Sequence, residues 1–200
     1  MDSMPSEVRA VMRRLEELDT LDREEGAPRS VRLRAIRPEV GELLLVLALG
    51  SGSRTIVEVG TSAGYSTLWL AVAARRNAGR VTTFEVDPAK VALAEVTFAR
   101  AGVADLIDLR HEDGGAGLAR FAGAADLVFL DSEKEQYEAF LQPAVEALRP
   151  GGMLVADNLI SHAGELEGFR RAALGHPQLC GLLVPIGRGE LLAVKVPAGA

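Results

Sequence analysis

The N-terminal part of this chain has hydrophobic residues at helical spacing. Between Ser6 and about Arg23 they recur among Arg and Glu residues, at Val8, Val11, Met12, Leu15 and Leu18. This pattern predicts an amphipathic helix, which must cover another part of the protein. The charged segment from Asp22 to Arg37 contains glycine and proline, and we expect a loop or lid there. Pro38 then opens a second predicted helix, which runs to about Leu49.

Further along, short apolar runs alternate with helix-length segments. The predicted strands are Thr55 to Val59, Arg80 to Glu85, Leu106 to His111, Asp126 to Leu130, Met153 to Asp157, Gln178 to Pro185 and Glu190 to Val196. The predicted helices between them are Ser62 to Arg75, Pro88 to Ala101, Glu135 to Leu148 and Gly164 to Leu174. Strand and helix alternation of this kind is typical of a parallel sheet covered on both faces.

The end of the chain departs from this alternation. Only Gly187, Arg188 and Gly189 separate the last two strands, which is too short for a parallel crossover, so we expect an antiparallel hairpin. The predicted fold is therefore α/β: a Rossmann-like, doubly wound, seven-stranded and mostly parallel sheet with an antiparallel C-terminal hairpin strand. We divide the chain into an N-terminal helix and lid segment, residues 1–39, and a main domain, residues 40–200.

Composition narrows the function. The chain has 200 residues, 48% of them hydrophobic, and a net charge of −6, which argues against nucleic acid as a partner. The single cysteine, Cys180, lies in an apolar run, so no intrachain disulfide is possible and we expect a small core residue in a reducing compartment. Apolar stretches such as Leu43 to Leu49 are far too short to span a bilayer. We expect a cytoplasmic protein without membrane association.

Glycine and acidic residues follow the first three predicted strands. The first strand runs into a loop that contains Gly60 and Gly64, a spacing that fits neither a dinucleotide motif nor a phosphate-binding loop. Glu85 ends the second strand, where an acidic side chain can bind a ribose diol. Asp113 follows the third strand and could accept a hydrogen bond from an adenine amino group, although a plain acidic loop is an alternative. Taken singly, Gly60 and Gly64 could be ordinary turn glycines and Glu85 a solvated strand end, but together, at this spacing, they favour a nucleotide-like ligand.

The fourth and fifth strands carry oxygen donors at their carboxyl ends. Asp131 follows one strand, and Asp157 and Asn158 follow the other. Because adjacent parallel strands end side by side, two carboxylates and one amide oxygen should converge. Such ligands suit a hard cation such as Mg²⁺, with Mn²⁺ or Ca²⁺ as alternatives. Each residue alone is equally compatible with a helix cap or a turn.

Two further polar residues lie near this predicted cation site. Lys134 comes three residues after Asp131 and is close enough to face the same pocket, where it could act as a general base. A solvated surface lysine is the alternative. His162 follows Asn158 by four residues and could contact substrate or the metal shell, although a lone histidine is more often structural.

The segments IVEVGTSAGYSTLWLA, VTTFEVDP, DLVFLDSEKEQY and LRPGGMLVADNLI occur in this order. This set resembles the metal-dependent small-molecule O-methyltransferases typified by catechol O-methyltransferase and caffeoyl-CoA O-methyltransferase. The resemblance implies that the main domain binds S-adenosyl-L-methionine, with Gly60, Glu85 and Asp113 at its methionine chain, ribose and adenine. It implies Asp131, Asp157 and Asn158 as metal ligands and Lys134 as the catalytic lysine.

The residues that we expect to contact the cofactor are Glu58, Gly60, Thr61, Ser62, Gly64, Tyr65, Ser66, Glu85, Val86, Asp113, Gly114 and Asp131. The expected activity is methyl transfer to a hydroxyl of a small, catechol-like substrate chelated by a divalent metal, in a homodimer. The alternatives are a metal-independent methyltransferase, a non-catalytic metabolite-binding protein and, disfavoured by the glycine spacing, an NAD-dependent oxidoreductase.

Overall fold

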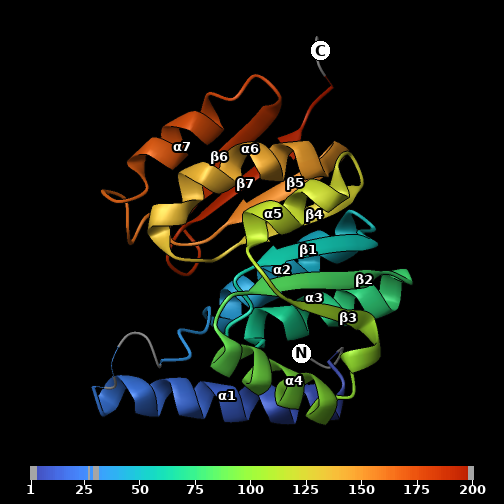
Figure 1. Ribbon diagram of the computed structural model, residues 1–200, viewed down its shortest axis with the longest axis vertical. Coiled ribbons are helices and arrows are strands. Elements are labelled where there is room, and N and C mark those ends of the chain that lie inside the picture. Colours follow the sequence, from blue (N-terminus) through green and yellow to red (C-terminus); the bar gives the residue numbers. More distant parts are fainter. Residues whose placement is uncertain (1–3, 27, 29–31, 198–200) are drawn as a thin grey trace.

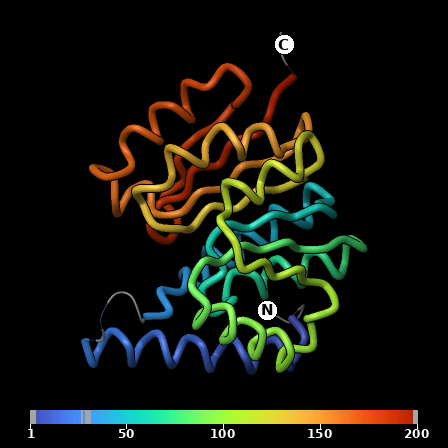
Figure 2. The backbone as a smooth tube through the Cα atoms, in the orientation of Figure 1, coloured from blue at the N-terminus to red at the C-terminus, as the bar shows by residue number. Residues whose placement is uncertain are grey.

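The computed structural model describes residues 4–26, 28 and 32–197. One seven-stranded sheet forms its centre, with helices on both faces (Figures 1 and 2). The strands are β1 (Thr55–Val59), β2 (Arg80–Glu85), β3 (Ile107–His111), β4 (Ala125–Leu130), β5 (Leu148–Ala156), β6 (Leu179–Val184) and β7 (Glu190–Lys195). Their order is β3-β2-β1-β4-β5-β7-β6, and β7 is antiparallel to both β5 and β6. This confirms the predicted α/β fold and its C-terminal hairpin.

The sheet separates the hydrophobic core into two clusters, and helices cover each of its faces. The helices are α1 (Ser6–Glu24), α2 (Pro38–Gly50), α3 (Tyr65–Asn77), α4 (Pro88–Arg100), α5 (Gly114–Leu118), α6 (Tyr137–Ala147) and α7 (Glu167–Leu174), with short 3-10 turns at Ala104–Leu106, Ala119–Phe121 and Lys134–Gln136. The cluster on one face includes residues of α1 to α4, and that on the other residues of α6 and α7. Because strand side chains alternate between faces, Ile56 lies in the first cluster and Val57 in the second.

The N-terminal helix packs on its own chain. Val8, Met12 and Leu15 are buried, and α1 contacts α3 and α4. Its apolar stripe therefore gives no reason to expect a partner subunit, and the homodimer stays a prediction, as does the division at residue 39. Part of the predicted lid, residues 27 and 29–31, lies outside the described residues. No described helix combines the length and the apolar character needed to cross a membrane.

The structure departs most from the sequence prediction at α3, α5 and β5. Helix α3 begins at Tyr65 rather than Ser62, because Ser62 (φ 48°) and Gly64 (φ 87°) have left-handed backbone. Helix α5 was not predicted, since glycine is a poor helix former. Its glycines are required by packing: a Cβ on Gly114 would lie 2.4 Å from Val59. Strand β5 begins five residues early, at Leu148, and its pairing with β4 has a register shift.

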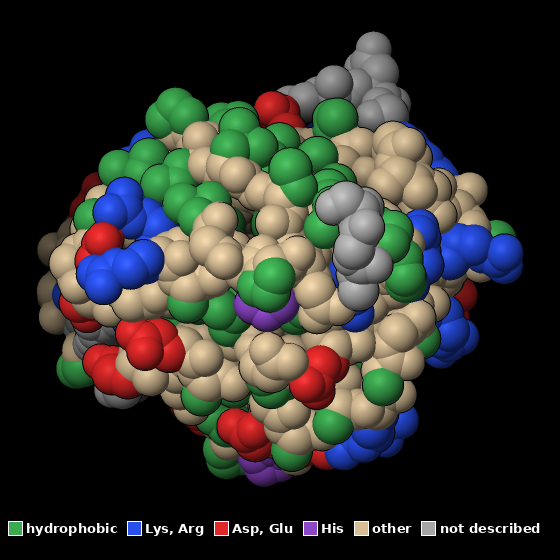
Figure 3. All heavy atoms as spheres, turned by 90° about the horizontal axis from the view of Figure 1, so that it is seen from above, with side chains coloured by type: hydrophobic (Ala, Val, Ile, Leu, Met, Phe, Trp, Pro, Cys, Tyr) green, Lys and Arg blue, Asp and Glu red, His purple; other side chains and the backbone are tan. Residues whose placement is uncertain are grey.

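The outer edge of the sheet is partly uncovered. Cys180 on β6 is exposed, so the prediction of a core cysteine is wrong. Leu182 and Val194 are 59% and 36% exposed on β6 and β7. Figure 3 views the molecule from above Figure 1, on the side of the β6 edge, and shows hydrophobic side chains gathered on part of that surface. The edge strand β6 has the apolar sequence of a core strand, but part of it is exposed, and this is why the sequence alone suggested a buried cysteine.

Candidate active site

The carboxyl ends of β1 to β5 meet at one edge of the sheet, where two cavities open. The first has a volume of about 310 Å³ and the second about 270 Å³. Both are lined by Arg34, Gly60, Ser62 and Asp131, which form the boundary between them. Of the predicted cofactor residues, the first cavity also contains Thr61, Tyr65 and Ser66, and the second contains Glu85, Val86, Asp113 and Gly114. Two of them, Glu58 and Gly64, line neither cavity.

The glycine loop after β1 is fixed by close backbone packing. Gly60 has φ 100°, and a Cβ there would lie 2.0 Å from the carbonyl oxygen of Asp131. A Cβ on Gly64 would lie 2.4 Å from the ring of Phe98. Both glycines are therefore required by neighbouring protein atoms, whether or not a ligand is bound. The loop lines both cavities because β1 and β4 end side by side at this point.

Glu58 supports this loop from beneath. It is fully buried and accepts hydrogen bonds from the hydroxyls of Ser66, Thr67 and Thr83, at 2.5, 2.5 and 2.6 Å. Burial raises the pKa of the Glu58 carboxyl to about 7, against the opposing effect of these three donors. Its side chain thus connects β1 to β2 and to the first turn of α3, and it reaches the cavities only through Ser66.

Glu85 fastens the end of β2 to the glycine loop. One carboxylate oxygen accepts hydrogen bonds from the backbone N–H groups of Val86 and Asp87, at 2.9 and 3.0 Å. The other accepts from the N–H of Ser62 at 2.8 Å. Three backbone donors hold the carboxylate in one orientation at the wall of the second cavity, and the oxygen that accepts from Ser62 keeps a further lone pair.

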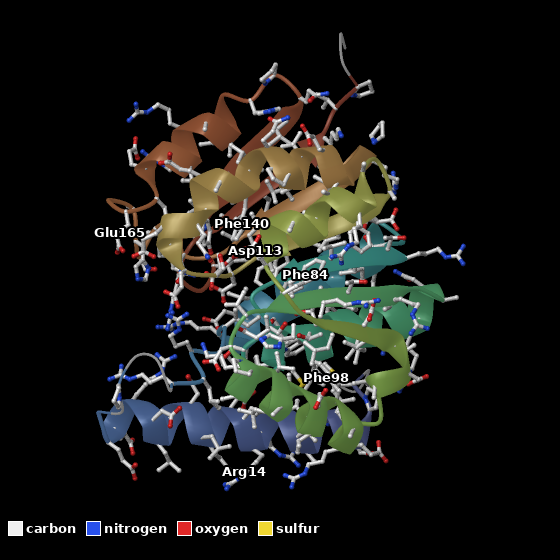
Figure 4. The ribbon with its side chains drawn as sticks, viewed as in Figure 1. Arg14, Phe84, Phe98, Asp113, Phe140 and Glu165 are labelled. Carbon is white, nitrogen blue, oxygen red and sulfur yellow. The ribbon has the colours of Figure 1, made fainter. Side chains whose placement is uncertain are left out.

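The far end of the second cavity combines an acidic side chain with two aromatic rings. Asp113 caps α5, accepting a hydrogen bond from the Ala116 N–H at 3.0 Å, and also lines the cavity. Phe84 from β2 and Phe140 from α6 lie near it (Figure 4) and line the same cavity. Strand-end reasoning did not find these rings, because a phenylalanine within a strand or helix has the same pattern as a core residue.

The end of β4 carries a compact polar group. Lys134, only 8% exposed, donates a hydrogen bond to the Ser132 carbonyl at 2.9 Å and pairs with Asp131 at 3.4 Å. The amide nitrogen of Asn158 donates to the same Asp131 oxygen at 2.9 Å. Asp131, Lys134 and Asn158 all line the first cavity. The structure therefore brings together three of the four residues predicted for the chemistry.

Asp157, the fourth, is buried beside this group and contacts none of the cavity space directly. Its side chain accepts a hydrogen bond from the Asn158 N–H. The phenolic hydroxyl of Tyr137 lies 3.2 Å from the Leu130 carbonyl and 3.1 Å from the Asp157 carbonyl, so it joins the ends of β4 and β5. Burial, followed by the charge of Asp157, raises the pKa of Asp131 to about 6.

Several oxygen atoms in this group lack hydrogen-bond donors. The Asn158 Oδ1 is buried without a partner, as are both carboxylate oxygens of Glu190 at the start of β7. Burial and the neighbouring charge of Asp157 raise the pKa of Glu190. Unsatisfied buried oxygens and mutually repelling carboxylates are stabilised by a cation, so the donor set fits a hard divalent ion. In the described part of the chain, no three His, Cys, Asp or Glu side chains are grouped as a metal site. The predicted set consists of two carboxylates, Asp131 and Asp157, and one amide, Asn158, so it does not form such a group.

The sequence did not indicate how much the N-terminal segment contributes to the site. Arg34 lines both cavities and pairs with Glu133 at 2.6 Å, while the Ser62 hydroxyl donates to the Leu33 carbonyl at 2.5 Å. The Tyr65 hydroxyl points to Glu16 on α1, at 2.5 Å. Strand-end rules cannot find Leu33 and Arg34, because these residues lie in a segment without periodic structure ahead of the sheet.

The order of the parallel strands, the antiparallel β7 and the ligand edge beyond β1 and β4 define a class I methyltransferase type of α/β fold. The chain belongs to the O-methyltransferase family, whose model matches residues 10–168. This confirms the family resemblance seen in the sequence.

Two curated relatives carry the name catechol O-methyltransferase. The catechol O-methyltransferase of Niastella koreensis is 37% identical over 137 residues, which cover 66% of this chain and 62% of the relative. That of Mycobacterium tuberculosis is 38% identical over 133 residues, 66% of this chain and 60% of the relative. The match therefore spans about three fifths of the length of each of these relatives.

Solved structures agree in fold over almost the whole chain. Cofactor-bound Rv0187 from MTB superposes with a TM-score of 0.77 and 30% identity, covering 90% of this chain and 89% of that protein. The O-methyltransferase TomG from Streptomyces achromogenes, solved in complex with SAM, has a TM-score of 0.75 and 26% identity, covering 92% and 89%.

Proposed function

We propose that this protein transfers the methyl group of S-adenosyl-L-methionine to a hydroxyl of a small aromatic diol held by a divalent cation. The observation that carries the proposal is the grouping of Asp131, Asn158 and Lys134 at the first cavity, next to the glycine loop. The names of the two catechol O-methyltransferase relatives support the same substrate class.

The two cavities divide the ligands between them. In our proposal the adenosine part lies in the second cavity, with Glu85 at the ribose, Asp113 at the adenine amino group and Phe84 and Phe140 against the ring. The methionine part crosses Gly60 to the first cavity. S-adenosyl-L-methionine supplies the methyl group when bound: its sulfur–methyl bond breaks as an oxygen–methyl bond forms, and S-adenosylhomocysteine leaves.

Asp131, Asp157 and Asn158 would hold the cation, with Mg²⁺ as the first choice. A bound divalent ion supplies positive charge that lowers the pKa of a coordinated hydroxyl. Lys134 lies within 3.4 Å of Asp131, and we propose that its amine accepts the proton of that hydroxyl at Nζ. The contacts that Lys134 and Asn158 make with Asp131 keep these groups in one orientation, which directs the acceptor oxygen toward the methyl group.

A methyl-transfer assay with catechol tests the proposal. The protein should form guaiacol with added Mg²⁺ and lose the activity in EDTA, and Asp157→Asn should lower the affinity for Mn²⁺ in calorimetry. Lys134→Met should keep S-adenosylhomocysteine binding and lower kcat by about 100-fold or more. Full activity in EDTA would identify a metal-independent methyltransferase. Tight cofactor binding without turnover on any diol or monohydroxy acceptor would identify a metabolite-binding protein.

A further inference from the structure

Positive side chains gather in the first cavity although the chain as a whole is acidic. Its lining contains five cations, Arg23, Arg32, Arg34, Lys134 and Arg188, and two carboxylates, Asp19 and Asp131. The whole chain has a net charge of −6. Local positive charge in a concave site focuses the field and favours an anionic ligand.

Partners of the same chain neutralise several of these cations. Arg23 pairs with Asp19 at 2.7 Å, Arg34 with Glu133 at 2.6 Å and Lys134 with Asp131 at 3.4 Å. Arg188 differs from them, because its guanidinium makes no ion pair or hydrogen bond with any residue that the structure describes. It is only half-exposed and lies against the first cavity. This arginine therefore has its donors available for a ligand.

The backbone of Arg188 is held rigidly in the hairpin turn between β6 and β7. Its carbonyl accepts hydrogen bonds from the N–H groups of Ile160 and Ser161, at 3.1 and 2.9 Å. Gly187 and Gly189 on either side have positive φ, and a Cβ on Gly189 would lie 2.3 Å from Ile160. Such a turn has little freedom to shift, so the arginine projects from a fixed base, as a binding residue requires.

This turn is also next to the proposed cation ligands. It packs on the segment that directly follows Asn158, and β7 continues from it with Glu190, the residue that lies beside Asp157. Arg188 therefore enters the first cavity from the side of the cation site, away from Glu85 and the second cavity. A diol held by these cation ligands would lie in the same cavity as Arg188.

We propose that the acceptor is an aromatic diol that carries a carboxylate, and that Arg188 binds this carboxylate. The inference rests on the proposed methyl transfer. A guanidinium presents two parallel N–H donors that match the two oxygens of a carboxylate, and a partly buried pair of this kind is stronger than one in water. The residue contributes to specificity and takes no part in the transfer itself.

A comparison of 3,4-dihydroxybenzoate with its methyl ester tests the role of the charge, since the two differ little in size. With Mg²⁺ and S-adenosyl-L-methionine, the protein should methylate the acid with a kcat/KM about 10-fold or more above that of the ester. Arg188→Gln should lower kcat/KM for the acid by about 10- to 100-fold, mainly through KM, and leave the ester within about twofold. Arg188→Lys should recover part of the loss, because it restores charge without the paired donors.

The matched control is Arg14→Gln, which makes the same change in net charge on the exposed outer side of α1 (Figure 4). It should leave the ratio of the two kcat/KM values unchanged. Calorimetric titration of the acid into the protein with Mg²⁺ and S-adenosylhomocysteine gives a second measurement, and Arg188→Gln should weaken that binding by the same factor.

An equal loss on acid and ester, or a wild-type preference for the ester, would overturn the inference and leave the proposed methyl transfer standing. Weakened S-adenosylhomocysteine binding in Arg188→Gln would assign the arginine to the methionine carboxylate instead. If Arg188→Gln lowers kcat/KM for caffeoyl-CoA but leaves that for caffeate unchanged, the arginine binds a phosphate group of the CoA part. If neither acid nor ester is methylated at all, the proposed function itself is wrong.

Discussion

Replacement of Gly60 by alanine tests whether packing between two strand ends sets the geometry of the cofactor loop. An alanine Cβ would lie 2.0 Å from the Asp131 carbonyl oxygen, whereas real Cβ contacts are essentially never under 3.0 Å. The loop and Asp131 must therefore move apart by about 1 Å, the difference between these two distances. A displacement of about 1 Å at a reacting site can lower the rate by roughly 100-fold.

The same substitution also strains the backbone, and Gly52 allows the two effects to be separated. Gly52 also has positive φ (63°), but a Cβ there would meet nothing within 4 Å. Left-handed backbone costs an alanine about 1–2 kcal/mol, partly offset by about 0.4–1 kcal/mol from the stiffer unfolded chain. Gly52→Ala should therefore lower Tm by no more than about 4 °C. Gly60 has φ 100°, farther from the left-handed region that an alanine can adopt, so Gly60→Ala carries at least this strain and the clash in addition.

Calorimetric titration with S-adenosylhomocysteine and thermal unfolding are the two measurements. We expect Gly60→Ala to lower Tm by clearly more than Gly52→Ala and to weaken cofactor binding by about 10- to 100-fold, while Gly52→Ala binds normally. If Gly60→Ala binds the cofactor as tightly as Gly52→Ala does, with a matching Tm, the loop does not depend on this contact and the reasoning is refuted.

Three further predictions concern the support of the site. The pKa of Glu58 is raised to about 7 by burial, so the folded state holds this proton more tightly than the unfolded chain. The resulting stabilisation is complete below about pH 4.5 and disappears as pH rises through 7. Relative to Glu58→Gln, the wild type should lose up to about 3 kcal/mol of unfolding free energy between those limits; a pH-independent difference would contradict this. Tyr137→Phe should lose about 1–2 kcal/mol in urea unfolding, since its hydroxyl lies 3.2 Å from the Leu130 carbonyl, whereas no loss would mean that water replaces the contact. Asp126→Ala should destabilise by about 2 kcal/mol and leave cofactor affinity unchanged, because Asp126 accepts from the Thr55 N–H at 2.7 Å at the opposite edge of the sheet; weakened affinity would contradict that separation.

The fold was predictable because the central strands β1, β4 and β5 are short, largely buried apolar runs and the segments between the strands have helical length. Asp87 followed by Pro88, for example, begins α4 as a cap and first-turn proline should. Helix α5 was not predictable in this way, because its glycines are required by contacts with Val59 and Phe84, which lie far away in sequence. Local composition opposed a helix there, and tertiary packing determined the result.

Part of the candidate site followed from one topological rule: parallel strands end at the same edge. It predicted that Glu85, Asp113 and Asp131 would line a common site, and all three do. The rule gave no information on Arg34, which belongs to the segment before the sheet, or on Arg188, which belongs to an antiparallel hairpin. A single sequence cannot show that such segments return to the sheet edge, since no local pattern encodes the contact.

The backbone at the first cavity is strained at three residues from three different segments. Arg34, Ser62 and Asn158 have positive φ (51°, 48° and 76°), although none is glycine. Each such residue costs about 1–2 kcal/mol, which the surrounding contacts must offset. The Ser62 N–H donates to Glu85, and the Asn158 amide donates to Asp131, so the same carboxylates that we propose for ligand binding also stabilise the strained loops. Removing either carboxylate should therefore release a loop as well as a ligand contact, and the loss of binding should exceed that of the contact alone.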